Sequence, residues 1–68
     1  MDTFSTRLKS LRKEKNLTQK QIAAMLNISL TGYAGWEQGY REPNIESIKK
    51  LCDILETSAD YLLGITNN

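Results

Sequence analysis

The sequence predicts an all-α fold of five short helices. Apolar residues recur at spacings of three and four in several segments, and no stretch alternates apolar and polar residues as a strand would. Residues with capping side chains precede these segments, and Gly or Asn follows them. Since 68 residues can bury only a small core, we expect a single domain over residues 1–68.

The first helix is expected over about residues 5–15, and Leu8 and Leu11 continue the helical spacing that begins at Phe4. Asn16 follows as a stop signal.

The second helix is expected over about residues 18–26. The hydroxyl of Thr18 can cap it, and Gln21, three residues later, completes a capping box. Asn27 tolerates a left-handed backbone, so it suits a tight turn after the helix. Ala23 is small enough to let a following helix cross closely.

The third helix is expected over about residues 29–38, with Ser29 as its cap and Gly39 as its terminator. Tyr33 and Trp36, together with the preceding Ile28, give it an inward face, so we expect both aromatic rings in the core rather than on the surface as stacking platforms. The opposite face is presented outward by Ser29, Leu30, Thr31, Ala34 and Gly35. In this layout, two helices flank a turn of about three residues and the second helix has an open face. It is the layout in which the second helix serves as a recognition helix.

Residues 39–44 read as a loop, because Pro43 lacks a backbone donor and restrains its neighbour. The fourth helix is expected over about residues 44–55, with an apolar stripe of Ile45, Ile48, Leu51, Cys52 and Leu55. The fifth is expected over about residues 58–63, with Tyr61, Leu62 and Leu63, and Gly64 ends it.

The charge is uneven along the chain. Up to Trp36 there are six basic and two acidic residues, whereas from Glu37 onward there are three basic and six acidic residues. A positive half can approach phosphates while a negative half stays clear or meets another protein. A solvated helix face rich in Lys gives the same counts, so charge alone does not decide between the two interpretations.

Composition excludes several classes of function. The chain has one cysteine, Cys52, and no His, so we expect neither a disulfide nor a metal site, and no cofactor. The sequence offers no pair of carboxylates in a pocket, no catalytic triad and no glycine-rich phosphate-binding loop. We therefore expect no catalytic residue and no enzyme. No apolar run approaches the roughly 18 residues of a membrane span, and the first residues lack a signal-peptide pattern, so we expect a cytoplasmic protein without membrane contact.

Four segments carry a resemblance to a known family. They are RLKSLR at 7–12, LTQKQIA at 17–23, WEQGYREP at 36–43 and SADYLLG at 58–64. In this order and spacing the chain resembles the Cro and phage-repressor (XRE-type) family of helix-turn-helix transcriptional regulators over nearly its whole length. The resemblance implies a lambda-repressor-like DNA-binding domain whose helix-turn-helix is formed by the second and third helices.

The resemblance also implies which residues bind double-stranded DNA. They lie at the start of the second helix, along the third and just beyond it: Thr18, Gln19, Ser29, Leu30, Thr31, Gly32, Gly35, Gln38, Arg41 and Asn44. The first two would contact a phosphate, since helix N-termini suit anions. Base-reading positions fall on Leu30, Thr31 and Gly35, and the last three residues would hold the DNA backbone. A structural ion pair is implied between Arg12 and Glu37.

The sequence departs from the family at two of these positions. Leu30 and Gly35 stand where relatives often have Arg, Lys or Gln, which can bond base edges. We expect Leu30 and the methyl of Thr31 to pack on thymine methyls, with Gly32 and Gly35 letting the helix lie close to DNA. Each Gly costs about 1 kcal/mol of helix propensity relative to Ala, so the third helix is expected to be intrinsically weak.

The predicted function is a sequence-specific transcriptional regulator, a repressor, that binds its operator as a homodimer without a small-molecule ligand. A two-fold dimer would present two recognition helices about 34 Å apart, and Tyr61 and Ile65 are expected to be exposed for self-association. We expect control through concentration, a partner or degradation, because the sequence leaves no space for a sensing domain. Two alternatives stay open: a protein-interaction module such as an antitoxin or anti-repressor partner on the same scaffold, and an RNA-binding protein that prefers unpaired strands.

Overall fold

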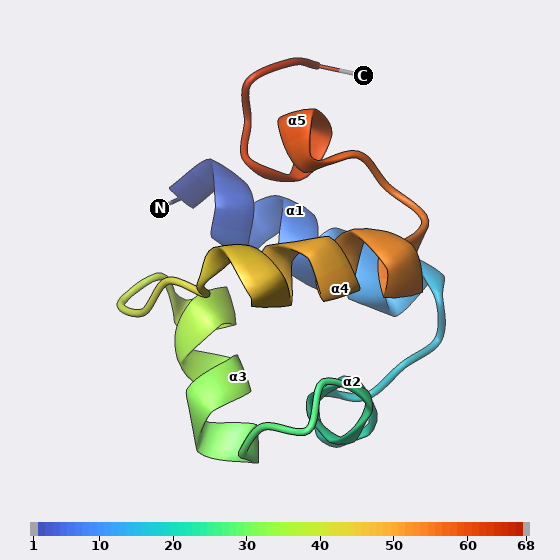
Figure 1. The fold of residues 1–68 in the computed structure, drawn as a ribbon, viewed down its shortest axis with the longest axis vertical. Coiled ribbons are helices and arrows are strands. Elements are labelled where there is room, and N and C mark those ends of the chain that lie inside the picture. The colour runs from blue at the N-terminus through green and yellow to red at the C-terminus, as the bar shows by residue number, and fades with distance from the viewer. Residues whose placement is uncertain (1, 68) are drawn as a thin grey trace.

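The computed structural model describes residues 2–67, and the regular structure in this range is helical. The helices are α1 (Asp2–Glu14), α2 (Gln19–Met25), α3 (Leu30–Gln38), α4 (Ile45–Leu55) and α5 (Ala59–Leu62). No strand occurs within residues 2–67, which confirms the predicted all-α fold. Figure 1 shows α2 and α3 at one end of the molecule and α5 at the other, with α1 and α4 between them.

The helix bounds differ from the expected ones in three ways. α1 begins at Asp2 rather than near residue 5, because one earlier turn is needed to bring Phe4, 1% exposed, onto the buried face of Leu8. The expected starts at residues 18, 29, 44 and 58 are each one residue early, because all four residues are N-caps with extended backbones. The expected ends at 15, 26 and 63 each lie one residue beyond the observed ends.

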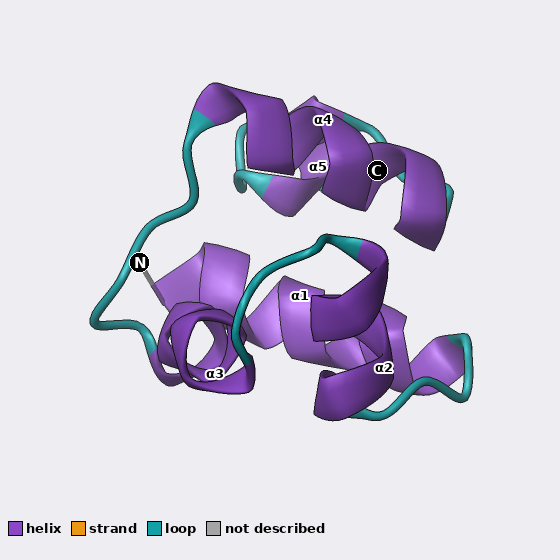
Figure 2. Cartoon of the chain, turned by 60° about the horizontal axis from the view of Figure 1, so that its bottom comes forward, coloured by secondary structure: helices purple, strands orange, loops and turns teal. Residues whose placement is uncertain are grey.

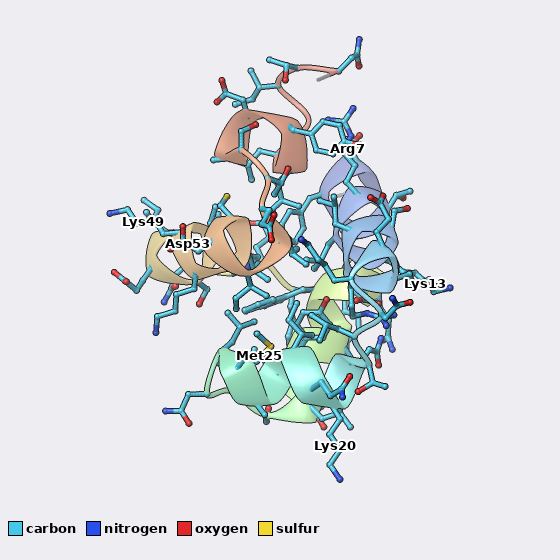
Figure 3. All side chains as sticks on the ribbon, turned by 90° about the vertical axis from the view of Figure 1, so that its right-hand side faces the viewer. Arg7, Lys13, Lys20, Met25, Lys49 and Asp53 are labelled. Carbon is cyan, nitrogen blue, oxygen red and sulfur yellow. The ribbon has the colours of Figure 1, made fainter. Side chains whose placement is uncertain are left out.

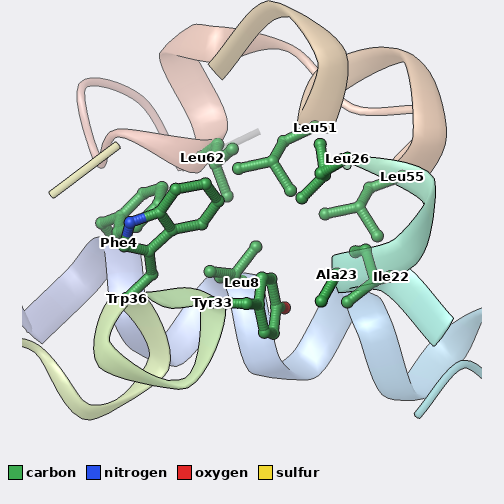
Figure 4. Packing of buried hydrophobic residues seen from close by; sticks show 10 residues of the cluster. All are labelled: Phe4, Leu8, Ile22, Ala23, Leu26, Tyr33, Trp36, Leu51, Leu55 and Leu62. Carbon is green, nitrogen blue, oxygen red and sulfur yellow. The ribbon is translucent and has the colours of Figure 1, made fainter. Parts of the chain in front are cut away.

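The core draws residues from all five helices and from the C-cap of α2. Figure 4 shows its ten members: Phe4, Leu8, Ile22, Ala23, Leu26, Tyr33, Trp36, Leu51, Leu55 and Leu62. Ile45 is absent from it and is 74% exposed, so the expected apolar stripe of α4 is wrong at its first residue. Ile45 is the first helical residue of α4, one turn or more before the buried Leu51, where no other element covers it.

Helix packing leaves the α2–α3 pair at the periphery of the molecule. α3 contacts both α1 and α2, while α5 contacts α1 and α4. Figure 2 shows α4 and α5 together on one side and α1, α2 and α3 on the other. The described chain measures 29 × 23 × 20 Å, so a helix at its periphery can present a whole side to a partner.

Candidate nucleic-acid interface

α2 and α3 form a two-helix unit around a tight turn. Asn27 has a φ of 58°, the left-handed conformation that the sequence predicts for it. The turn is closed where the N–H of Ile28 donates to the carbonyl of Ala23 at 3.0 Å. Ala23 is 2% exposed, so its small side chain lies inside the packed pair. The angle between the helices is therefore fixed by local hydrogen bonds and by close packing.

The start of α2 has a complete capping box. The hydroxyl of Thr18 accepts from the N–H of Gln21 at 3.0 Å, and the Gln21 side-chain oxygen accepts from the N–H of Thr18 at 2.8 Å. Both residues are exposed. The helix therefore begins at a fixed residue, with the positive end of its dipole open on the molecular surface.

The two faces of α3 are sharply different. Tyr33 is fully buried and Trp36 is 7% exposed, with their rings packed edge to face at a centroid distance of 5.7 Å. This confirms that both rings are core residues rather than stacking platforms. On the other face Leu30 is 46% exposed and Thr31 is exposed. The outer face of α3 is therefore open to solvent at Leu30 and Thr31, while the inner face is part of the core.

The two glycines of α3 are constrained by different neighbours. A Cβ on Gly32 would lie 3.1 Å from the hydroxyl oxygen of Ser29, which caps the helix by accepting from the N–H of Gly32 at 3.0 Å. A Cβ on Gly35 would lie 2.8 Å from Cδ of Arg41. Gly35 is buried, so it does not provide the open approach to DNA that the sequence suggests, because the Arg41 side chain already covers it.

A buried polar cluster joins α1, α2 and α3 through the carboxylate of Glu37, whose side chain is 3% exposed. Arg12 donates to it from Nε at 2.6 Å and from a terminal nitrogen at 3.2 Å. Gln19 donates from Nε2 at 3.0 Å, and the hydroxyl of Tyr33 donates at 2.5 Å. Arg12 and Glu37 thus form the ion pair that the resemblance implies. Gln19, which the resemblance implies contacts a phosphate, has its side chain held by the same cluster.

The electrostatics of the cluster favour its charged form. Burial acts to raise the pKa of Glu37, but the hydrogen bonds from Arg12, Tyr33 and Gln19 and the charge of Arg12 outweigh it, and the net pKa lies below its ordinary value. Burial first, and then the hydrogen bond to Glu37, raise the pKa of Tyr33. Tyr33 therefore stays a neutral donor at physiological pH.

Beyond α3 the chain turns back across the helix. Gly39 is the C-cap and has a φ of 88°, a conformation that favours glycine. Tyr40 is 64% exposed and Arg41 is exposed. Asn44 accepts from the N–H of Ser47 at 2.8 Å and caps α4. This expected DNA-binding residue therefore has a structural role that was not predicted from the sequence.

The expected DNA-binding residues divide by position. Leu30, Thr31 and Gln38 lie exposed on α3, and Thr18 and Ser29 are exposed caps. Figure 3 shows Lys20 of α2 and Lys13 of α1 pointing away from the core, on different sides from Lys49 and Asp53 of α4. Lys13 and Lys20 are therefore separated from Lys49 and Asp53 of α4.

The carboxyl-terminal segment is fastened to α1. The guanidinium of Arg7 lies 4.1 Å from the ring centroid of Tyr61 and donates to the backbone carbonyls of Tyr61 and Thr66. Tyr61 is therefore half-buried rather than exposed as expected, while Ile65 is 69% exposed. A sequence pattern cannot show a contact between residues 54 positions apart.

The described residues offer few groups for metal binding, membrane insertion or thiol chemistry. Among residues 2–67 no cluster of three or more metal-ligating side chains occurs. None of the helices in that range is long and apolar enough to cross a membrane. Cys52 is a free thiol, and burial and the nearby Asp53 charge raise its pKa, which makes it less reactive.

A capped pair of helices around a left-handed turn, with the second helix open on its outer face, defines the chain as a helix-turn-helix protein. Residues 8–62 match the helix-turn-helix family model, and the chain belongs to this family, in the XRE-type group of Cro and phage repressors. The family resemblance read from the sequence is thereby confirmed.

Several curated relatives are similar to the chain. The HTH-type transcriptional regulator AnsR of Bacillus subtilis (strain 168) is 45% identical over 58 residues, which cover 85% of this chain and 50% of the relative. ImmR of the same strain, also an HTH-type transcriptional regulator, is 40% identical over 62 residues, covering 91% and 49%. The cryptic phage CTXphi transcriptional repressor RstR of Vibrio cholerae serotype O1 is 45% identical over 58 residues, covering 85% and 52%. The chain thus spans about half the length of the curated relatives it matches.

Proposed function

We propose that this chain is a sequence-specific double-stranded DNA-binding transcriptional regulator, a repressor, that inserts α3 into the major groove of its operator. The observation that carries the proposal is the outer face of α3, where Leu30 is 46% exposed beside the exposed Thr31, while Tyr33 and Trp36 hold the opposite face in the core. Family membership and relatives named as transcriptional regulators support the same function, and argue against an enzyme.

The proposed interface assigns each residue a mode of contact. The caps Thr18 and Ser29 and the side chain of Gln19 approach phosphates at the helix starts. Leu30 and Thr31 pack against thymine methyls in the groove. Gly32 and Gly35 belong to α3 itself and lie in the part of the helix that faces the groove. Gln38 at the end of α3 and Asn44 beyond it contact the DNA backbone and set the position of the helix, and Arg41 contacts the DNA beside them.

We further propose that the regulator binds as a homodimer in the cytoplasm. A two-fold pair would set two α3 helices about one duplex turn, or 34 Å, apart, so the operator would be a pair of half-sites with that spacing. Ile65, which is 69% exposed in the carboxyl-terminal segment, is an apolar candidate for the contact between subunits. Sedimentation equilibrium, with Ile65→Asp as the variant, tests this assembly. A wild-type chain that stays monomeric at the concentrations that bind DNA contradicts it.

The binding proposal is tested with labelled duplexes of random sequence at low salt, followed by titration with salt. The logarithm of the affinity should fall with the logarithm of the salt concentration, with a slope of about −0.9 for each phosphate contacted. Thr31→Asp should abolish binding, because it brings a carboxylate to the phosphates and groove edges. Glu46→Asp on α4 is the matched control that leaves the α3 face unchanged.

The outcomes separate the proposal from its alternatives. No retention on duplex at low salt would favour a protein-interaction module on the same scaffold. Preference for unpaired RNA over duplex would favour the RNA-binding alternative. Unchanged duplex affinity in Thr31→Asp, with the variant still folded by circular dichroism, would show that α3 does not enter the groove.

A further inference from the structure

One position on the outer face of α3 is covered by a side chain from outside the helix. Thr31 and Gly35 are one turn apart and lie on the same face. Thr31 is exposed, yet Gly35 is buried. A Cβ built on Gly35 would lie 2.8 Å from Cδ of Arg41, 3.0 Å from Cγ and 3.3 Å from its Cβ. The aliphatic stem of Arg41 therefore occupies the place that a side chain at position 35 would take.

The backbone fixes this arrangement. Gly39 has a φ of 88° and reverses the chain at the end of α3. The N–H groups of Gly39 and Arg41 both donate to the carbonyl of Gly35, at 3.1 and 3.3 Å. The start of the Arg41 side chain is thus held over Gly35 by the helix terminus itself and does not depend on side-chain contacts.

The guanidinium of Arg41 differs from those of the other two arginines in its hydrogen bonding. Among residues 2–67, Arg7 donates to two backbone carbonyls and Arg12 pairs with Glu37, whereas no hydrogen bond or ion pair in that range uses the side chain of Arg41. Arg41 is exposed. Its five donors therefore remain available to a ligand on the side of α3 that carries Thr31.

We propose that Arg41 is a specificity-determining residue that binds a guanine in the major groove. Its side chain reaches the groove through the space that the absent side chain of Gly35 leaves open. This inference rests on the proposed insertion of α3 into DNA. Leu30 and Thr31 cannot make two parallel hydrogen bonds to one base edge, whereas a guanidinium matches O6 and N7 of guanine in a bidentate manner. Gly35 then leaves room for the side chain of Arg41, and a larger residue at position 35 would displace it.

A phosphate contact by Arg41 is the competing assignment, and it predicts a different result. A phosphate contact positions the protein without carrying sequence information. Loss of such a contact weakens binding to all duplexes alike. Loss of a guanine contact removes the preference at one base pair and leaves the preferences at the others intact.

The test selects duplexes from a randomised library with the full chain and then measures affinities for the selected site and its single-base-pair variants. The wild type should prefer a G·C pair at one position in each half-site by about 5- to 150-fold. Arg41→Ala should reduce that preference to about one while the other positions keep theirs. Lys50→Ala, which removes an exposed cation on α4, is the matched control and should change no preference.

Gly35→Ala supplies the second arm, because its methyl must displace the stem of Arg41. It should lose the same G·C preference although the arginine is present, and the double variant Gly35→Ala/Arg41→Ala should be no worse than Arg41→Ala alone. Circular dichroism and thermal midpoints establish that each variant folds.

Three outcomes overturn the inference in distinguishable ways. A uniform loss of affinity in Arg41→Ala on all duplexes assigns Arg41 to a phosphate and leaves the proposed function standing. A G·C preference that survives in Gly35→Ala shows that Gly35 does not seat the reading group. A wild-type chain that binds no duplex removes the proposed function, and this inference with it.

Discussion

Glu37 connects three helices through a single side chain. Its carboxylate, 3% exposed, accepts from Arg12, Gln19 and Tyr33. A buried charge of this kind is tolerated only while its partners remain, because the cost of removing it from water is otherwise not offset. The cluster therefore concentrates much of the mutational sensitivity of the α1–α2–α3 junction in one residue.

Replacing Arg12 with Ala should lower the free energy of unfolding by about 3–5 kcal/mol, because the Glu37 charge is left buried without its ionic partner. The variant also loses the hydrogen bond from Arg12 to the carbonyl of Leu17, 2.7 Å long. Urea unfolding followed by circular dichroism measures the change. Lys13→Ala, at the exposed neighbouring position, is the control and should stay within about 0.5 kcal/mol of wild type. Equal stability of Arg12→Ala and wild type would contradict a structural role for the pair.

The lowered pKa of Glu37 makes a signed prediction about acid. The folded state holds the Glu37 proton more weakly than the unfolded chain, so the stabilisation is complete above the ordinary Glu pKa of about 4.3 and is lost as pH falls through the lower folded value. Unfolding free energies of wild type and Glu37→Gln, measured between pH 7 and pH 3, should therefore converge below about pH 4. A difference that stays constant over this range would show that Glu37 does not titrate with a lowered pKa.

At the scale of elements, the starts of α2, α3, α4 and α5 are specified locally. Thr18, Ser29, Asn44 and Ser58 all accept from a backbone N–H three residues later. Such caps are readable from sequence because the donor and acceptor are close along the chain. The sequence therefore predicts five helices and the turn at Asn27, and it misplaces the boundaries mainly by counting the caps as helical.

The parts that the sequence could not predict depend on distant segments. A helical pattern shows that Gly35 faces outward, but it cannot show that residue 41 returns to cover it. The same pattern places Ile45 on the apolar stripe of α4 and cannot show that the core ends before it. Tyr61 is another case, since its partner Arg7 belongs to the first helix. Periodicity identifies a face, whereas tertiary packing decides what covers that face.

The capping box of α2 makes the clearest prediction about an element. Thr18→Ala removes the acceptor for the N–H of Gln21 and should cost about 1 kcal/mol, which lowers the thermal midpoint by about 4–8 °C in a domain of this size. Ser10→Ala, at an exposed position inside α1, removes a hydroxyl without removing a cap and should not lower the midpoint. Similar midpoints for the two variants would mean that packing, rather than the cap, fixes the start of α2.

At the scale of the whole molecule, the two ends of the chain are joined across the fold. α1 contacts both α3 and α5, so it links the helix that carries the proposed reading face to the carboxyl-terminal segment that carries Ile65. The core residues Phe4, Leu8 and Leu62 are each 1% exposed or less. Arg7 adds a polar fastening at the edge of this contact by donating to two backbone carbonyls.

Arg7→Met should loosen the carboxyl-terminal segment without unfolding the rest. The methionine retains an apolar stem beside Tyr61 but cannot donate to the carbonyls of Tyr61 and Thr66, a loss of about 1–2 kcal/mol at this partly exposed site. Backbone amides of residues 62–66 should therefore exchange with solvent faster, while the amides of Ile22 and Ala23 in the core keep their relative protection. Lys9→Met, at an exposed position on α1, is the control and should leave residues 62–66 unchanged. If exchange in the segment is equally slow in Arg7→Met and wild type, apolar packing alone holds α5 on α1, and the polar fastening contributes no measurable stability.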